Sequence, residues 1–135
     1  MSSTFTLGID LHGVADAFPT IVAPVLKFLR ESGTKVIFIS GPPAGEVFQQ
    51  LSSLGYEEGC HYDLIVSVVD FIRSKDYAMW QDTQGNWWTD DAIWWSSKAK
   101  ICEEYSVDVI IDDSPKYAPF FENIKTKFVL VNSSR

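Results

Sequence analysis

The stretch FTLGIDLHGVADAFP, residues 5–19, decides the fold. Its first five residues are mostly apolar and predict a strand that is buried in a sheet. Gly13 indicates that the chain bends sharply soon after this strand. Asp10 and His12 therefore lie at the end of a buried strand, where a charged side chain needs partners. This position makes both residues candidates for chemistry.

Similar apolar runs recur along the chain, and helical patterns lie between them. The runs are continuous rather than alternating, which is typical of strands buried on both faces. The strands are predicted at residues 36–39, 107–111 and 128–131, with residues 64–69 as a weaker case. Apolar residues at helical spacing occupy residues 22–29, 47–54, 93–105 and 117–124. The alternation predicts an α/β fold, a Rossmann-like open and mostly parallel sheet flanked by helices.

Length and charge limit the classes of function. The 135 residues, of which 46% are hydrophobic, fit one domain over residues 1–135. A net charge of −7 argues against binding to a nucleic acid polymer or to an anionic membrane. There is no secretory signal pattern, and no apolar run approaches the roughly 18 residues of a membrane span. We expect a cytoplasmic protein in which Cys60 and Cys102 are free thiols.

Residues 77–95 depart from the α/β pattern. In YAMWQDTQGNWW, residues 77–88, two aromatic segments flank a polar turn that contains Gly85 and Asn86. This arrangement predicts a small Trp-rich β-hairpin inserted into the framework. All five tryptophans lie in this segment: Trp80, Trp87, Trp88, Trp94 and Trp95. They are candidates for a substrate roof, for core residues or for a dimer contact, so monomer and homodimer both stay open.

Polar residues also follow the other predicted strands. Ser40 and Gly41 follow residues 36–39, and Asp112 and Asp113 follow the run VDVII. Because the carboxyl ends of parallel strands meet at one edge of a sheet, these residues and Asp10 are predicted to share one polar site. Each of them could also serve as an ordinary helix or turn cap.

The order of these residues along the chain resembles the four motifs of the haloacid dehalogenase superfamily of phosphohydrolases. GIDLHGV resembles the first motif, VIFISG the second, WWSSKAK with Lys98 the third, and VIIDDSP the fourth. The resemblance implies a haloacid dehalogenase-like core of the minimal-cap type. It also implies a magnesium-dependent phosphatase that acts on a small phosphorylated substrate. Asp10 would attack phosphorus and form an aspartyl phosphate.

The resemblance also assigns roles to the other residues. Mg²⁺ would be held by Asp10, by the backbone carbonyl of His12 and by Asp112 or Asp113. Phosphate would be bound by Ser40, Gly41 and Lys98, and Lys98 would also balance the charge of the carboxylates. Trp80, Trp87 and Trp88 would be the residues of a substrate roof, because aromatic faces stack on nucleobases. The segment IDDSP is also similar to 5'(3')-deoxyribonucleotidases, which makes a nucleotide one candidate substrate.

His12 is the main departure from the family pattern, which usually has a second aspartate at this position. Histidine can carry out both proton transfers of the reaction near neutral pH. Two alternatives remain open: a catalytically impaired protein that still binds phosphate and metal, and a purely structural histidine. Besides an enzyme and a non-catalytic binding protein, the protein could be an assembly module that makes contacts through its tryptophans.

Overall fold

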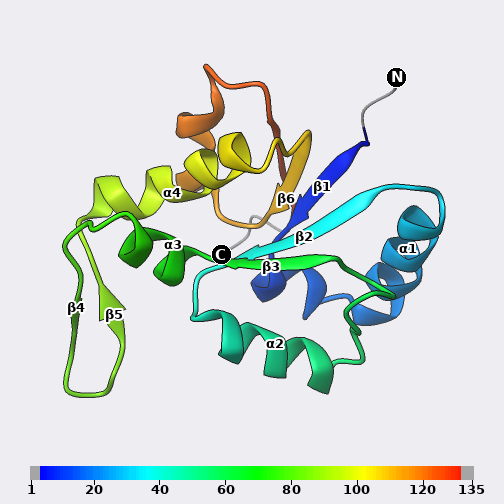
Figure 1. The fold of residues 1–135 in the computed structure, drawn as a ribbon, viewed down its shortest axis with the longest axis horizontal. Helices are drawn as coiled ribbons and strands as arrows, with labels where there is room; N and C mark the ends of the chain where they lie inside the picture. Colours follow the sequence, from blue (N-terminus) through cyan, green and yellow to red (C-terminus); the bar gives the residue numbers. More distant parts are fainter. Residues whose placement is uncertain (1–3, 132–135) are drawn as a thin grey trace.

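A five-stranded parallel sheet forms the centre of the computed structural model, which describes residues 4–131 (Figure 1). The strand order is β3, β2, β1, β6 and β7. Their bounds are β1 Thr6–Ile9, β2 Lys35–Ser40, β3 Leu64–Ser67, β6 Val109–Asp112 and β7 Lys127–Leu130. The first strand of the chain is therefore the central one, with β2 and β6 on either side. The predicted α/β fold with a parallel sheet is confirmed.

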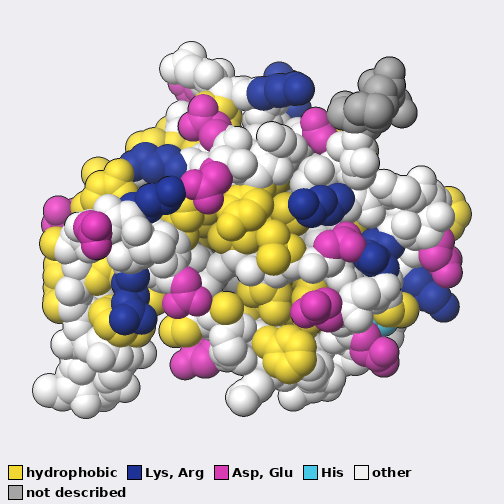
Figure 2. Space-filling model, viewed as in Figure 1, with side chains coloured by type: hydrophobic (Ala, Val, Ile, Leu, Met, Phe, Trp, Pro, Cys, Tyr) yellow, Lys and Arg dark blue, Asp and Glu magenta, His cyan; other side chains and the backbone are white. Residues whose placement is uncertain are grey.

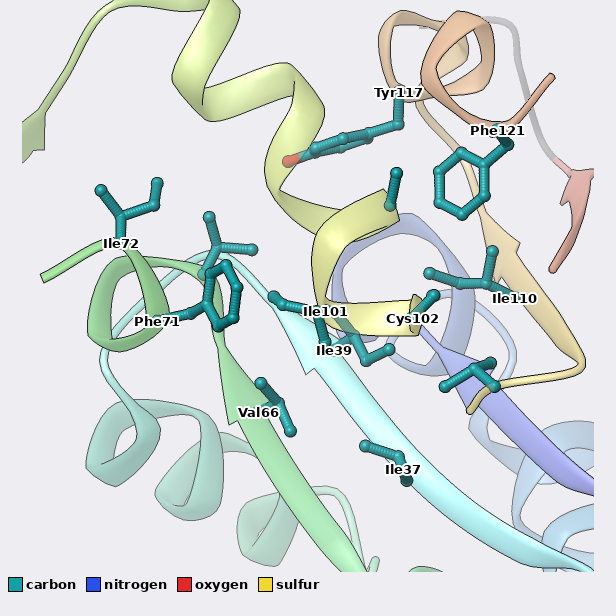
Figure 3. Close-up of a cluster of buried hydrophobic side chains, with 13 residues drawn as sticks. Ile37, Ile39, Val66, Phe71, Ile72, Ile101, Cys102, Ile110, Tyr117 and Phe121 are labelled. Carbon is teal, nitrogen blue, oxygen red and sulfur yellow. The ribbon is translucent and has the colours of Figure 1, made fainter. Parts of the chain in front are cut away.

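Helices cover both faces of this sheet. They are α1 Pro19–Glu31, α2 Ala44–Ser53, α3 Val68–Ser74, α4 Asp91–Glu104 and the 3₁₀ helix η2 Pro115–Phe121. Side chains of β2 alternate between two buried clusters: Ile37 and Ile39 belong to one, and Val36 and Phe38 to the other. The first cluster contains residues of α3, α4 and η2 (Figure 3). The second contains residues of α1 and α2.

The weak strand prediction at residues 64–69 was too long. Only Leu64–Ser67 form β3, and Val68 already belongs to α3. The Ser67 side chain accepts a hydrogen bond of 3.0 Å from the backbone N–H of Asp70, which caps α3. A serine cap is a stronger local signal than the β-branched residues that follow it, because it satisfies a free N–H of the first helical turn. The helix α3 was not predicted.

The tryptophan segment contains a second, two-stranded sheet. Strands β4 (Trp80–Gln81) and β5 (Trp87–Trp88) pair antiparallel beside α3 and α4, apart from the main sheet (Figure 1). The carboxylate of Asp82 holds the connecting turn, since it accepts hydrogen bonds from the backbone N–H groups of Gln84 and Asn86. The turn is thus fixed by one side chain from within the segment.

The described surface mixes both signs of charge. Figure 2 shows Lys and Arg side chains separated by acidic ones on the visible face, with apolar side chains exposed between them. None of the helices within residues 4–131 has the length and apolar character needed to cross a membrane.

Replacing Gly8 with alanine should destabilise the fold. A Cβ at Gly8, in the central strand, would lie 3.0 Å from Cδ1 of Ile39 and 3.2 Å from Cγ1 of Val107. We expect the free energy of unfolding to fall by about 1 to 3 kcal/mol, the usual cost of overpacking a core. Gly45→Ala in α2, where a Cβ would meet nothing within 4 Å, is the control and should be neutral or stabilising. Urea unfolding of both variants measures the difference, and equal stabilities would refute this account of Gly8.

Candidate functional site

Asp10 leaves the central strand at the carboxyl edge of the sheet. Its backbone N–H donates to the carbonyl of Ile111, and its Oδ1 accepts a hydrogen bond of 2.9 Å from the N–H of Leu11. The Asp10 side chain thereby caps the helical turn η1, Leu11–Ala15. Within this turn Gly13 has a φ of 81°, a conformation that favours glycine, and the chain bends there as the sequence predicted.

Three carboxylates meet at this edge. One carboxylate oxygen from each of Asp10, Asp112 and Asp113 lies within 4.8 Å of the others. The cause is the sheet register, because Ile9 of β1 is paired with Ile111 of β6. Asp10, the first residue after β1, therefore comes level with Asp112, the last residue of β6, and Asp113 follows directly. Magnesium takes oxygen ligands at about 2.1 Å, which puts two ligands of one ion at most about 4.2 Å apart, so the carboxylates need only a small inward movement to share an ion.

Lys98 of α4 supplies the positive charge of the cluster. It is 1% exposed, and its Nζ lies 2.5 Å from Oδ2 of Asp112 and 3.4 Å from Oδ1 of Asp10. The same ammonium group lies over the ring of Tyr117, 4.5 Å from its centre. Burial disfavours the charged amine, but the negative groups around it outweigh burial and raise the pKa of Lys98 above its ordinary value.

Burial is the main cause of the raised pKa of Asp10. The loss of solvent raises the pKa of this carboxyl from 3.8 to about 6, although Lys98 acts in the opposite direction. The negative charges of Asp112 and Asp113 add to the increase. Asp112, which is fully buried, is fixed on both sides: Oδ2 pairs with Lys98 and Oδ1 accepts from the N–H of Ser114 at 3.0 Å.

These groups open into a pocket of about 310 Å³. Its lining consists of Asp10, His12, Gly41, Pro42, Trp95, Lys98, Asp112, Asp113, Ser114 and Tyr117. The structure therefore brings together most of the residues predicted for the site. We call this cavity the acidic pocket.

Ser40 differs from the prediction, because it does not line the acidic pocket. It is 0% exposed, and its Oγ has no hydrogen-bond partner within the described chain. Ser40 is the last residue of β2 and lies inside the sheet, whereas Gly41 is the first residue beyond the strand and reaches the pocket. Gly41 packs closely there, since a Cβ would lie 3.3 Å from Cζ2 of Trp94.

His12 lies at the rim of the acidic pocket. Its side chain is 46% exposed, and Nδ1 is 3.5 Å from Oδ2 of Asp16. Asp16 is itself held by the turn, because its Oδ1 accepts a hydrogen bond of 2.7 Å from the N–H of Gly13. The imidazole is accessible to a ligand in the acidic pocket and is oriented by a carboxylate.

The predicted roof of Trp80, Trp87 and Trp88 does not cover the acidic pocket. Trp80 and Trp88 are about half exposed, and the indole N–H of Trp88 donates to Asp82 within its own turn. Trp87 lines a neighbouring pocket of about 380 Å³, which shares Gly41 and Pro42 with the acidic pocket.

Two aromatic residues other than Trp80, Trp87 and Trp88 line the acidic pocket instead. Trp95 and Tyr117 pack edge to face, with ring centres 4.8 Å apart. Trp95 precedes Lys98 by three residues in α4, so helical spacing places both on one face. That spacing was the signal that could have identified Trp95.

Comparison with known proteins identifies a fold and no family. No protein-family model and no curated protein matches the chain. A glycosyltransferase from Rickettsia africae ESF-5 is similar in structure, with a TM-score of 0.51 and 17% identity over 94% of this chain. This chain covers 29% of that protein, less than a third of its length. A universal stress protein in complex with cAMP has a TM-score of 0.46 and 14% identity, over 98% of this chain and all of that one. Likeness at such low identity bears on the fold alone.

Proposed function

We propose that this protein is a magnesium-dependent phosphomonoester hydrolase with a core like that of the haloacid dehalogenase superfamily. The observation that carries the proposal is the cluster of three carboxylates around one buried lysine. When ionised, these groups give the acidic pocket an excess of negative charge. A phosphate group can approach such a cluster only if a divalent cation offsets that charge.

The residues present fit magnesium, because hard oxygen ligands are the ones that it prefers. Asp10, Asp112, Asp113 and the backbone carbonyl of His12 would hold the ion. Bound there, Mg²⁺ would neutralise charge on the phosphate oxygens and so lower the barrier to attack by a carboxylate. Lys98 would contact a phosphate oxygen as a second positive charge while it keeps Asp112 in place.

Asp10 would act as the nucleophile of the reaction, and His12 would carry out the proton transfers. The hydrogen bond from Leu11 and the ion pair with Lys98 both involve Oδ1 of Asp10, so Oδ2 is the oxygen that would attack phosphorus. As the new P–O bond forms, the ester P–O bond breaks and the leaving alcohol takes a proton from the imidazolium of His12. Water then attacks the aspartyl phosphate and gives its proton to His12, which releases phosphate and restores Asp10.

Removal and return of magnesium tests this function. We expect hydrolysis of p-nitrophenyl phosphate to disappear in EDTA and to return when excess Mg²⁺ is added. Asp113→Asn should weaken Mg²⁺ binding measured by calorimetry by about tenfold or more, since it removes an oxygen charge from the cluster. Asp76→Asn, an exposed position after α3 with a φ of 61°, is the control and should bind Mg²⁺ as the wild type does. Equal hydrolysis with and without Mg²⁺ would refute the proposal.

Replacement of His12 decides between a working and an impaired enzyme. If His12 is the acid and base, His12→Ala should lower kcat by about 10² to 10⁴, with Mg²⁺ binding retained through the backbone carbonyl. His12→Asp should stay active with a different pH profile, because a carboxyl would replace the imidazole. Steady-state rates against pH measure both. If the wild type is inert and only His12→Asp is active, the protein is an impaired relative that binds phosphate and metal.

A further inference from the structure

A second cavity adjoins the acidic pocket. It has a volume of about 530 Å³ and lies between the turn after β1 and the helix α2. Its lining consists of Leu11, His12, Asp16, Glu46, Gln49, Gln50, Ser53 and Leu54. We call it the α2 groove. The α2 groove and the acidic pocket share His12.

The groove wall from α2 is polar along its whole length. The other lining residues of α2 follow Glu46 by three, four and seven residues, which places them on the same face of the helix: Gln49, Gln50 and Ser53. The adjacent face of α2 carries Val47 and Leu51, which are buried in the core. Both glutamine side chains are exposed and offer amide donors and carbonyl acceptors to a ligand.

The charge of the α2 groove is negative. Asp16 and Glu46 contribute two carboxylates, and His12 is the one basic residue among those that line it, since no lysine or arginine does. Asp16 is fixed by its hydrogen bond from Gly13, while Glu46 is exposed at the start of α2. Carboxylates accept hydrogen bonds and attract cations, and they repel other anions.

We propose that the α2 groove binds the alcohol part of the substrate and selects alcohols that carry hydroxyl or ammonium groups and no negative charge. This inference rests on the proposed function. With the phosphate in the acidic pocket, the ester oxygen would lie toward His12, the residue common to both cavities. The carbon skeleton beyond that oxygen would then enter the α2 groove. There the ligand's N–H and O–H groups would meet the Asp16 and Glu46 carboxylates and the two glutamine amides.

Three phosphomonoesters of similar size test this selection. We expect kcat/KM for phosphoethanolamine and glycerol 3-phosphate to exceed that for 3-phosphoglycerate by about tenfold, because the carboxylate of the last meets two negative side chains. Glu46→Lys should reduce this preference at least about fivefold, because it replaces a negative side chain of the groove with a positive one. Glu31→Lys at the end of α1 makes the same change in net charge outside the groove and should keep the preference. An unchanged preference in Glu46→Lys overturns the inference.

A binding measurement separates failure of this inference from failure of the proposed function. Phosphoethanolamine is added with Mg²⁺ to the Asp10→Asn variant, which would bind the ligand without hydrolysing it. We expect the side-chain amide NMR signals of Gln49 and Gln50 to shift, whereas inorganic phosphate should shift them little. If turnover is absent but these signals shift, the groove stands and the hydrolase proposal fails. If turnover is present and neither signal shifts, the groove proposal fails alone.

Discussion

Asp10→Asn should reduce the rate of p-nitrophenyl phosphate hydrolysis by at least about 10⁴-fold, which is the usual size of the rate loss when a covalent nucleophile is removed. An amide of nearly the same shape replaces the carboxylate, so the pocket is kept and the attacking group is lost. Steady-state rates with saturating Mg²⁺ measure the loss, with Asp76→Asn as the matched control. Residual activity within about tenfold of the wild type would exclude Asp10 as the nucleophile.

The stability of the same variant shows whether it stays folded. Burial raises the pKa of Asp10 to about 6, so the folded state binds this proton more readily than the unfolded state. The contribution to stability is complete below about pH 3.8, the pKa in the unfolded chain, and is lost as the pH rises through 6. In EDTA at pH 7, Asp10→Asn should therefore be more stable than the wild type by up to about 3 kcal/mol. Urea unfolding at pH 4 and pH 7 measures this difference, which should disappear at pH 4.

Lys98→Met should lower the free energy of unfolding by about 3 to 5 kcal/mol at pH 7. The ammonium group is buried against Asp10 and Asp112, and methionine fills a similar volume without the charge. Asp112, which is fully buried, would then lack its cation. Chemical denaturation in EDTA measures the loss.

Two further variants separate the effect of the lost charge from the effect of altered packing in this experiment. Lys100 lies in the same helix, but its ammonium group is exposed and contacts the hydroxyl of Tyr77 at 3.3 Å. Lys100→Met should therefore change the free energy of unfolding by no more than about 0.5 kcal/mol. The double variant Lys98→Met with Asp112→Asn should be more stable than Lys98→Met alone, because it removes the unpaired carboxylate. Equal losses from Lys98→Met and Lys100→Met would contradict the assigned ion pairs.

The sheet could be predicted because its strands are short apolar runs that end in polar residues. Continuous runs such as VIFI in β2 need cover on both faces, and this need selects a parallel sheet with helices on either side. The helix α3 was missed, because Val68 and Val69 read as a continuation of β3 when the Ser67 cap is not considered. The hydrogen bond from Asp70 to the Ser67 side chain favours a helix there, although Val68 and Val69 have a high β propensity.

The site could be predicted in part for a related reason. Asp10 and Asp113 directly follow strands and Asp112 ends one. Neighbouring parallel strands bring such residues together regardless of the loop conformations. Trp95 was left out of the predicted roof and Tyr117 was not assigned to the site, because their positions depend on how α4 and η2 pack rather than on a strand end. Ser40 shows the limit of the strand-end rule, because Ser40 and Asp112 are both the last residues of their strands and only Asp112 lines the acidic pocket.

The strand order has a consequence for how the protein is made. Of the five strands, the central strand β1 is synthesised first. Its neighbour β2 and then β3, which pairs with β2, are the next strands of the sheet, so one side of the sheet can assemble early. The other neighbour comes much later, as the hydrogen bond from Thr6 to Asp108 spans 102 positions of the chain. Until β6 emerges from the ribosome, Asp10 lacks Asp112 beside it, and the edge of β1 that pairs with β6 is uncovered. The nascent chain therefore depends on delayed, long-range pairing, and this late step is where aggregation would compete with folding.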